Sequence, residues 1–245
     1  MKWLSGFLSL VLLIPATATA DVWDIAHRGY AAVNPESTML AFQRAHEQGA
    51  DGLEFDVRQT QDKVLVVTHD STIPELANSL VESTLFSDLS RATDIPSLDK
   101  VLAFAKRSGQ TVWLEIKQSH RYPGIIDRVI GLVEQYGLAD VTVIQSFNHN
   151  DLQTIKQKKP ELRLLALYAS GFRLNDVPSF VDYLGLPIDQ IYLNATMISR
   201  LHQMGKQVIF WRRSHLSENK QVLQQFIDAG ADGFMLDRSL KAIMR

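Results

Sequence analysis

Three acidic residues lie in two short apolar stretches of the sequence and could together bind a metal ion. Glu54 and Asp56 are two positions apart in Gly-Leu-Glu-Phe-Asp-Val, and Glu115 lies in Trp-Leu-Glu-Ile. Side chains two apart on a strand point to the same side, and carboxylates that converge in an apolar setting need a cation. Oxygen ligands suit Mg2+ or Ca2+, with Mn2+ also possible, rather than a structural zinc. We therefore predict one divalent cation held by Glu54, Asp56 and Glu115.

Two histidines are candidates for acid and base chemistry. His27 lies in Ala-His-Arg-Gly, directly after an apolar run, and His69 lies in Thr-His-Asp. A histidine has an unperturbed pKa of about 6.5, so it can accept or donate a proton near neutral pH. We predict that His27 and His69 form a catalytic pair, in which one residue takes a proton and the other gives one.

Two cations and two aromatic residues complete the candidate site. Arg28 and Lys117 are predicted phosphate contacts, because a guanidinium binds two phosphoryl oxygens at once and an ammonium adds a point charge. Their alternative role is a structural ion pair with the same carboxylates. Phe147 and Trp211 follow expected strands and could form an apolar wall for the alcohol part of a substrate, or serve only as packing.

A short polar segment, Asn34-Pro-Glu-Ser-Thr, leads into an expected helix. Ser37 or a neighbour is expected to cap the start of that helix. Glu36 could in addition orient a catalytic histidine from behind. Both roles stay open on the sequence alone.

Eight apolar runs alternate with longer segments of helical period, and this alternation indicates βα units with a parallel sheet. The expected strands are residues 22–26, 52–57, 112–116, 141–145, 163–167, 190–193, 208–211 and 233–236. We therefore predict an α/β fold, a TIM-type (β/α)8 barrel. In such barrels the chemistry takes place at the carboxyl ends of the strands, where the candidate residues lie.

A ninth apolar run, residues 64–67, follows the second strand too closely for a crossover helix, so we expect an antiparallel hairpin and a short lid after strand 2. A turn in the middle of the connecting residues would set Val67 opposite Asp56 and His69 opposite Glu54. The spacing alone thus predicts that His69 lies beside two carboxylates.

One segment occurs twice with small changes. Gln48–Asp56 and Ala229–Asp237 share the run Gly-Ala-Asp-Gly and each ends in an aspartate. Gly49 and Gly230 suit the end of a helix, where a left-handed backbone is common. We interpret both segments as the same junction between a helix and the next strand.

The composition limits the possible partners and the compartment. The chain has 245 residues, of which 46% are hydrophobic, a formal net charge of -2 and no cysteine. This charge argues against binding to nucleic acid or to anionic membranes, so the expected partner is a small molecule. The absence of cysteine excludes disulfides and thiolate metal sites. The sequence does not indicate an oligomeric state.

The first 20 residues have the order of a cleaved secretory signal. Lys2 precedes an apolar run from Trp3 to Ile14, and small residues follow up to Ala20. The run is shorter than the roughly 20 apolar residues that span a bilayer, which favours cleavage over a stable membrane anchor. We predict a signal peptide at residues 1–20 and a single exported domain at 21–245, located in the periplasm or secreted.

Six segments in this order resemble the glycerophosphodiester phosphodiesterase family, over about residues 22–240. They are Ala-His27-Arg-Gly-Tyr, Asn-Pro-Glu36-Ser-Thr, Gly-Leu-Glu54-Phe-Asp56-Val, Val-Thr-His69-Asp, Trp-Leu-Glu115-Ile-Lys117 and Phe-Met-Leu-Asp237-Arg. The resemblance implies a TIM barrel that hydrolyses deacylated phospholipids to glycerol 3-phosphate and an alcohol. It also implies an acid–base pair, metal ligands and phosphate contacts at the residues already assigned to those roles.

The chain departs from the family pattern where the leaving alcohol would be recognised. Ser37 stands in place of the usual asparagine, residues 73–79 lack the Arg-Thr-Thr-Asn-Gly run, and Trp211-Arg-Arg-Ser replaces Trp-Thr-Val-Asn. Arg212 and Arg213 are expected to reach solvent, with an anionic contact as the alternative.

Three other functions compete with this interpretation. A phospholipase D-like activity on lysophospholipids would need an apolar path, which residues 71–95 could provide. Glycoside hydrolysis by Glu54 and Glu115 would leave the histidines without a role. A non-catalytic, phosphodiester-binding protein of the cell envelope should have lost a metal ligand or a histidine, and the sequence keeps all five.

Overall fold

A computed structural model describes residues 22–212 and 218–245. The predicted signal peptide lies outside the described residues, as does Arg213. Eight parallel strands form a closed barrel, because β1 pairs with both β2 and β11. They are β1 (Trp23–His27), β2 (Gly52–Gln59), β6 (Thr111–Ile116), β7 (Thr142–Ser146), β8 (Arg163–Leu167), β9 (Tyr183–Pro187), β10 (Gln207–Trp211) and β11 (Gly233–Leu236). The predicted TIM-type barrel is confirmed.

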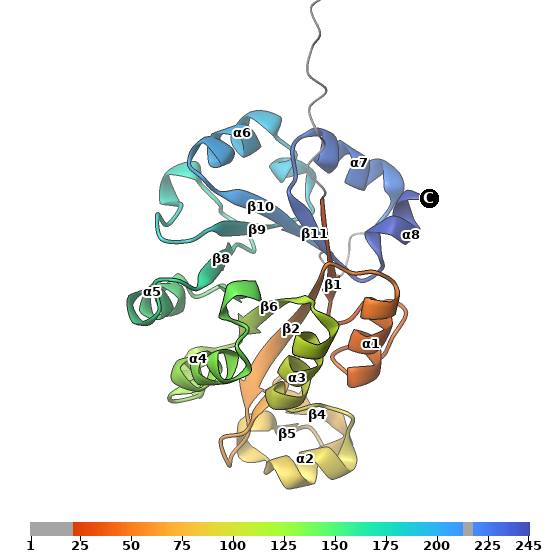
Figure 1. Ribbon diagram of the computed structural model, residues 1–245, viewed down its shortest axis with the longest axis vertical. Coiled ribbons are helices and arrows are strands. Elements are labelled where there is room, and N and C mark those ends of the chain that lie inside the picture. The colour runs from red at the N-terminus through yellow and green to blue at the C-terminus, as the bar shows by residue number, and fades with distance from the viewer. Residues whose placement is uncertain (1–21, 213–217) are drawn as a thin grey trace, which may run out of the picture.

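Helices surround the strands on the outside (Figure 1). The main ones are α1 (Met39–Glu47), α3 (Leu98–Ser108), α4 (Ile125–Tyr136), α5 (His149–Lys158), α6 (Ala195–Gln203), α7 (Lys220–Asp228) and the short α8 (Leu240–Met244). Their starts follow from local sequence, since Thr38, Asn148 and others accept a backbone hydrogen bond as N-caps. Gly49 and Gly230 have φ values of 80° and 100° just after α1 and α7, as expected for helix ends.

The sixth strand is not where the sequence placed it. Residues 190–193 were expected to form a strand, but Gln190–Tyr192 is a 3-10 helix, and the strand is Tyr183–Pro187. Gly185 and Pro187 are poor strand formers, and they hide the pattern. The connection from β8 to β9 contains only a 3-10 turn, Leu174–Asp176, so the helical spacing that marks the other repeats is missing there.

The hairpin after β2 is present, with its register shifted by one residue. β3 (Leu65–Val67) pairs antiparallel with β2, and Val67 faces Val57 rather than Asp56. The turn is centred at Asp62, half a position later than assumed, and next to it Lys63 adopts a left-handed backbone, with φ of 70°, and its amide donates to the Thr60 carbonyl. Spacing therefore predicts the hairpin correctly and its pairing only approximately.

The lid expected after strand 2 is a small insertion at the lower edge of the molecule in Figure 1. It contains β4 (Thr72–Ile73), β5 (Ser79–Leu80), α2 (Phe86–Ala92) and the 3-10 turns Pro74–Leu76 and Val81–Ser83. Its apolar side chains form a core of their own around Val66, Ile73, Val81 and Leu89. The insertion is thus packed on its own hairpin.

A separate apolar cluster fills the inside of the barrel. Trp113 lies at its centre, with ring contacts to Trp23 and Tyr183 at centroid distances of 6.1 Å and 5.2 Å. Residues two positions further along a strand point to the same interior. Trp113 and its neighbours therefore form the floor beneath Glu115 and the other strand-end residues.

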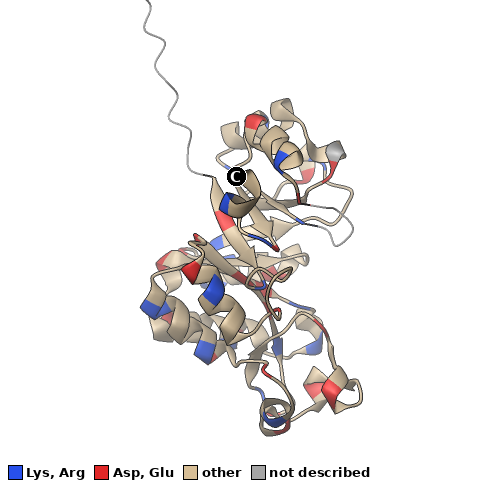
Figure 2. Cartoon of the chain, turned by 90° about the vertical axis from the view of Figure 1, so that its right-hand side faces the viewer, with Lys and Arg blue, Asp and Glu red and all other residues tan. Residues whose placement is uncertain are grey.

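The outer surface carries charges of both signs. Lys and Arg are interspersed with Asp and Glu over the helices in Figure 2. No helix in the described part of the chain is long and apolar enough to cross a bilayer.

Candidate active site

Strand ends on one side of the barrel surround a cavity of about 670 Å3. The site residues predicted from the sequence all line it: His27, Arg28, Glu36, Glu54, Asp56, His69, Glu115, Lys117, Phe147 and Trp211. Gln145, Arg212 and Asp237 line it as well and were not among the predicted site residues. The cavity therefore gathers residues that lie far apart in the sequence.

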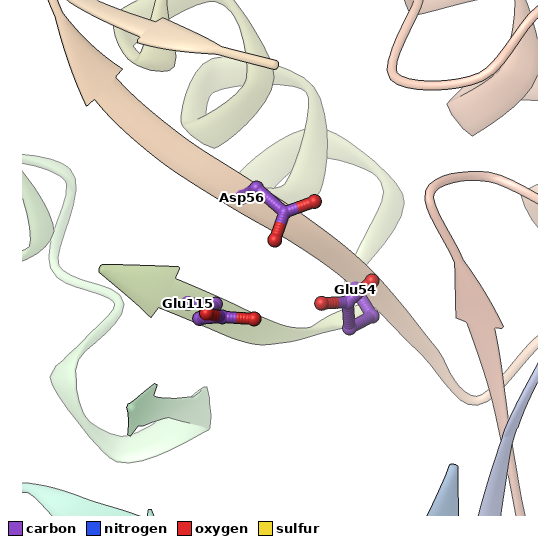
Figure 3. Close-up of side chains that lie close together, drawn as sticks. All are labelled: Glu54, Asp56 and Glu115. Carbon is purple, nitrogen blue, oxygen red and sulfur yellow. The ribbon is translucent and has the colours of Figure 1, made fainter. Parts of the chain in front are cut away.

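The three carboxylates form a compact acidic group at the bottom of this cavity. Glu54 and Asp56 project from β2 and Glu115 from β6, and all three point toward one another (Figure 3). One oxygen of each lies within 4.8 Å of the others. Asp56 and Glu115 are register partners on neighbouring strands, which is why residues 59 positions apart in sequence can meet. The predicted ligand set thus has a shape suited to one ion.

Burial changes the acidity of these groups. Only 2% of Glu54, 1% of Asp56 and 7% of Glu115 is exposed. Burial and then the Asp56 charge raise the pKa of Glu115 to about 8, and burial raises that of Glu54 to about 7. Burial acts on Asp56 in the same direction, but Lys117 and Arg28 outweigh it and lower its pKa to about 2. Near neutral pH, Glu54 and Glu115 therefore resist full ionisation, because the nearby cations do not offset burial and the repulsion among the carboxylates.

The two predicted phosphate contacts are paired with these carboxylates. Lys117 Nζ lies 3.0 Å from Glu115 Oε1 and 3.3 Å from Asp56 Oδ1. Arg28 Nε lies 3.4 Å from Asp56 Oδ2, and its Nη1 donates to both oxygens of Glu36. The structural ion pairs left open by the sequence are therefore present, and both cations also face the cavity.

The backbone around Arg28 is unusual. Arg28, Gly29 and Tyr30 have φ values of 51°, 80° and 63°. The Arg28 amide donates to the Glu54 carbonyl at 3.0 Å and to Glu54 Oε2 at 3.2 Å. A Cβ at Gly29 would lie 2.6 Å from the Cβ of Ala41, so only glycine fits against α1. A left-handed backbone is unfavourable in conformational free energy for Arg28 and Tyr30, and such strain is often found at functional sites. Here the turn places Arg28 beside the acidic group.

His27 is held by an aspartate from the other end of the chain. Its Nδ1 donates to Asp237 Oδ1 at 2.5 Å, and its Nε2 lies 4.0 Å from Glu54 Oε2. A carboxylate only accepts, so the proton is on Nδ1, and Nε2 faces the acidic group. Burial lowers the pKa of His27, but the Asp237 hydrogen bond and the Glu54 charge outweigh it, so the pKa lies above its usual value.

His69 lines the same cavity and its side chain is more exposed than that of His27. Its Nδ1 bonds to Asp70 Oδ1 at 2.9 Å, which leaves Nε2 available for proton transfer. Burial, with the charges of Arg28 and Lys117, lowers the pKa of His69 despite the opposing charge of Asp56. The two histidines therefore have pKa values shifted in opposite directions, as expected for groups with different environments.

Arg58, a buried arginine that was not among the predicted site residues, holds the His69 backbone. Arg58, on β2, donates to the His69 carbonyl through Nε at 3.0 Å and Nη2 at 2.6 Å. Its Nη1 donates to Gln118 Oε1 at 2.9 Å and to the Tyr122 hydroxyl at 3.1 Å. The only sequence signal was a charged residue within an apolar strand.

Two sequence expectations need correction. Glu36 bonds to Arg28, and the residue that orients His27 is Asp237. The repeated Gly-Ala-Asp-Gly segment had marked Asp237 as the end of a strand without giving it a role. Arg212 was expected to reach solvent, but it forms ion pairs with Asp237 and Glu218 at the cavity wall. The high density of acidic residues at the barrel mouth explains why Arg212 turns inward.

The aromatic pair lies together at the cavity rim. The rings of Phe147 and Trp211 meet edge to face with centroids 6.0 Å apart. Lys117 Nζ lies 6.0 Å from the Phe147 centroid, within the range of a cation–π contact. In contrast, no residue of the insertion at 71–95 lines this cavity. The apolar wall therefore comes from barrel strands rather than from the lid.

The chain matches one family model and several known proteins along most of its length. Residues 27–241 match the model of the glycerophosphoryl diester phosphodiesterase family. The chain is 30% identical over 230 residues to a glycerophosphodiester phosphodiesterase of Caldanaerobacter subterraneus, covering 87% of this chain and 93% of the relative. It is also 30% identical over 239 residues to a protein of the same name from Bacillus altitudinis, covering 89% and 95%.

Solved structures show the same fold. A glycerophosphodiester phosphodiesterase from Agrobacterium tumefaciens superimposes with a TM-score of 0.75 at 24% identity, covering 89% of this chain and 97% of that one. An Oleispira antarctica phosphodiesterase in complex with the product sn-glycerol-3-phosphate gives a TM-score of 0.77 at 20% identity, covering 89% and 94%. At this level of identity the likeness describes the barrel alone.

Proposed function

The chain belongs to the glycerophosphoryl diester phosphodiesterase family, and from this we propose that it hydrolyses glycerophosphodiesters to sn-glycerol 3-phosphate and an alcohol with the help of one divalent cation. The family and the relatives identify the enzyme class, a glycerophosphodiester phosphodiesterase. The observation that carries the proposal is the convergence of two histidines, two cations and three buried carboxylates on a single cavity.

The carboxylate group is suited to a divalent cation. Fully ionised, Glu54, Asp56 and Glu115 would carry three negative charges against the two positive charges of Arg28 and Lys117, and the raised pKa values of Glu54 and Glu115 favour a further cation at this place. Asp56 Oδ2 is buried and, apart from the ion pair with Arg28, has no hydrogen-bond partner among the described residues. Hard oxygen ligands favour Mg2+, Ca2+ or Mn2+. A bound cation would neutralise phosphoryl oxygens and activate the attacking group.

The side chains of the cavity supply the remaining chemistry. Hydrolysis breaks the bond between phosphorus and the alcohol oxygen and forms one from phosphorus to an attacking oxygen. One histidine of the pair His27 and His69 removes the proton of the attacking hydroxyl, and the other protonates the departing alkoxide. Arg28 and Lys117 stabilise the charge that develops on the phosphoryl oxygens. The route through water directly, and the route through a cyclic phosphate followed by water, both end in glycerol 3-phosphate.

The lysophospholipid alternative finds no support in the described residues. A lipid chain needs an apolar path that begins at the cavity, yet the apolar side chains of residues 71–95 pack mostly into their own core. Leu80 and Leu85 are partly exposed, but neither lines the cavity. We therefore propose deacylated substrates.

Release of glycerol 3-phosphate from glycerophosphocholine and glycerophosphoethanolamine tests the proposal. Residues 21–245 are treated with EDTA and then assayed with Mg2+, Ca2+ or Mn2+. We expect metal-dependent turnover that is lost in His27→Ala and in His69→Ala. His46→Ala, on the exposed side of α1, is the matched control and should remain active. Failure to form any phosphomonoester with these metals would refute the proposal.

We further propose that the enzyme acts outside the cytoplasm. Support comes from the sequence of residues 1–20, which has the order of a cleaved signal. Mass spectrometry of protein exported by a Gram-negative host is expected to find Asp21 as the first residue. Full-length protein retained in the cytoplasm would contradict this.

A further inference from the structure

The carboxylate of Asp237 is shared between His27 and a second cation. Oδ1 accepts from His27 Nδ1 at 2.5 Å, and Oδ2 accepts from Arg212 Nη1. The three residues stand at the ends of β1, β11 and β10, which are neighbours in the barrel. A carboxylate with one partner can rotate about its single bond, whereas bonds to both oxygens define its plane. Arg212 therefore determines how Asp237 is presented to His27.

A buried glutamate holds the same unit from behind. Only 2% of the Glu218 side chain is exposed, and its Oε1 accepts from the Asp237 backbone amide at 2.7 Å. The same oxygen lies 3.5 Å from Arg212 Nε. Glu218 thus contacts the backbone of Asp237 and the guanidinium that binds the Asp237 side chain. Negative and positive groups alternate from Glu218 through Arg212 and Asp237 to His27.

We propose that Arg212 and Glu218 are positioning residues that fix Asp237 and thereby hold His27 with its Nδ1 protonated and its Nε2 facing the cavity. This inference rests on the proposed role of His27 in hydrolysis. Partners behind a functional histidine commonly set its orientation, and their loss lowers activity by about 10–100-fold.

The kinetic test uses Arg212→Gln and Glu218→Gln in the mature chain with glycerophosphocholine and the activating metal. We expect kcat to fall by about 10–100-fold with KM nearly unchanged, because the substrate contacts remain. Arg212→Lys should recover a large part of kcat, since an ammonium can still pair with Asp237. In an Asp237→Asn background, Arg212→Gln should cause little further loss, because residues that act through one another are not additive.

A second readout does not depend on turnover. In EDTA-treated protein labelled with 15N-histidine, the Nδ1 proton of His27 should give a downfield resonance that is absent from His27→Gln. Arg212→Gln and Glu218→Gln should shift or broaden this resonance, and Arg212→Lys should restore it. Arg91→Gln, which removes an exposed arginine paired with Asp88, is the control and should leave the resonance unchanged.

The outcomes separate this inference from its alternatives. An increase in KM with kcat unchanged would make Arg212 a substrate contact and would overturn it. A lower melting temperature with an unchanged His27 resonance and unchanged kcat would show that the ion pairs only join β10 to β11, which would also overturn it. If the wild-type chain turned over no glycerophosphodiester, the proposed function would fail, while the His27 resonance would still decide whether Arg212 and Glu218 position the ring. Should Arg212→Gln not fold, Glu218→Gln and Arg212→Lys carry both measurements.

Discussion

Replacing Arg58 by methionine should reduce both stability and turnover, because Arg58 fixes the backbone of His69. The guanidinium donates twice to the His69 carbonyl and once each to Gln118 and Tyr122. Methionine keeps the aliphatic stem but removes every donor. Two acceptors, the buried Tyr122 hydroxyl and the carbonyl of the half-buried His69, would lose this donor, whereas Gln118 is exposed and can bond to water instead.

The size of the effect follows from those contacts. A buried polar group left without a partner costs about 1–3 kcal/mol, and a half-buried one costs less, so the two acceptors together predict a loss of about 2–4 kcal/mol in the free energy of unfolding. Release of the His69 carbonyl should also let the imidazole move relative to the carboxylates. A displacement of about 1 Å can cost about 100-fold in rate, so we expect kcat/KM to fall by about 10–100-fold.

Urea unfolding followed by circular dichroism gives the stability, and release of glycerol 3-phosphate gives kcat/KM. The matched control is Arg128→Met. Arg128 donates to Gln59, the residue next to Arg58 on β2, and to the Pro123 carbonyl, so this variant should lose stability and keep its turnover. If Arg58→Met lost stability while its kcat/KM equalled that of Arg128→Met, the link between Arg58 and His69 would be refuted.

Three further predictions concern the metal, the barrel floor and the hairpin. Mg2+ or Ca2+ at 100 times its Kd should stabilise the wild-type protein by about 3 kcal/mol and so raise its melting temperature in a thermal shift assay. Glu115→Gln should abolish that rise. Trp113→Ala should lower the free energy of unfolding in urea by about 3–5 kcal/mol, since it empties a fully buried site; a loss below 1 kcal/mol would contradict this. Burial acts to raise the pKa of Asp62, but the hydrogen bonds that Asp62 accepts from Thr60 and from the Phe86 amide together outweigh it and hold the pKa below the usual value. Because the folded pKa is the lower one, the stabilising contribution of Asp62 is present above the unfolded pKa of about 4 and is lost as the pH falls through the folded pKa. In thermal melts, Asp62→Asn should therefore destabilise the protein at pH 7, and this effect should shrink as the pH falls below about 4.

Several features could be predicted from the order of residues because they depend on neighbours a few positions apart. The pair Glu54 and Asp56 shares one side of a strand by its spacing alone, and the cap at Thr38 follows from the polar segment before α1. The hairpin after β2 follows from a connection too short for a helix. Where local propensity was ambiguous, prediction was wrong. The run at 190–193 contains the strand formers Ile191 and Tyr192, whereas the true strand β9 contains Gly185 and Pro187.

Other features depend on contacts between distant segments. His27 meets Asp237 only because the barrel closes β1 against β11, and Glu54 meets Glu115 because β2 pairs with β6. Arg212 turns toward the cavity because it forms ion pairs there with Asp237 and Glu218, although its neighbours in the sequence predicted an exposed side chain. The shifted pKa values of Glu54 and Glu115 have the same origin, since burial and nearby charge exist only after folding. Strand periodicity and turn chemistry are short-range properties of the chain, whereas hydrogen-bond partners and acidity at this site depend on which strand ends the closed barrel brings together.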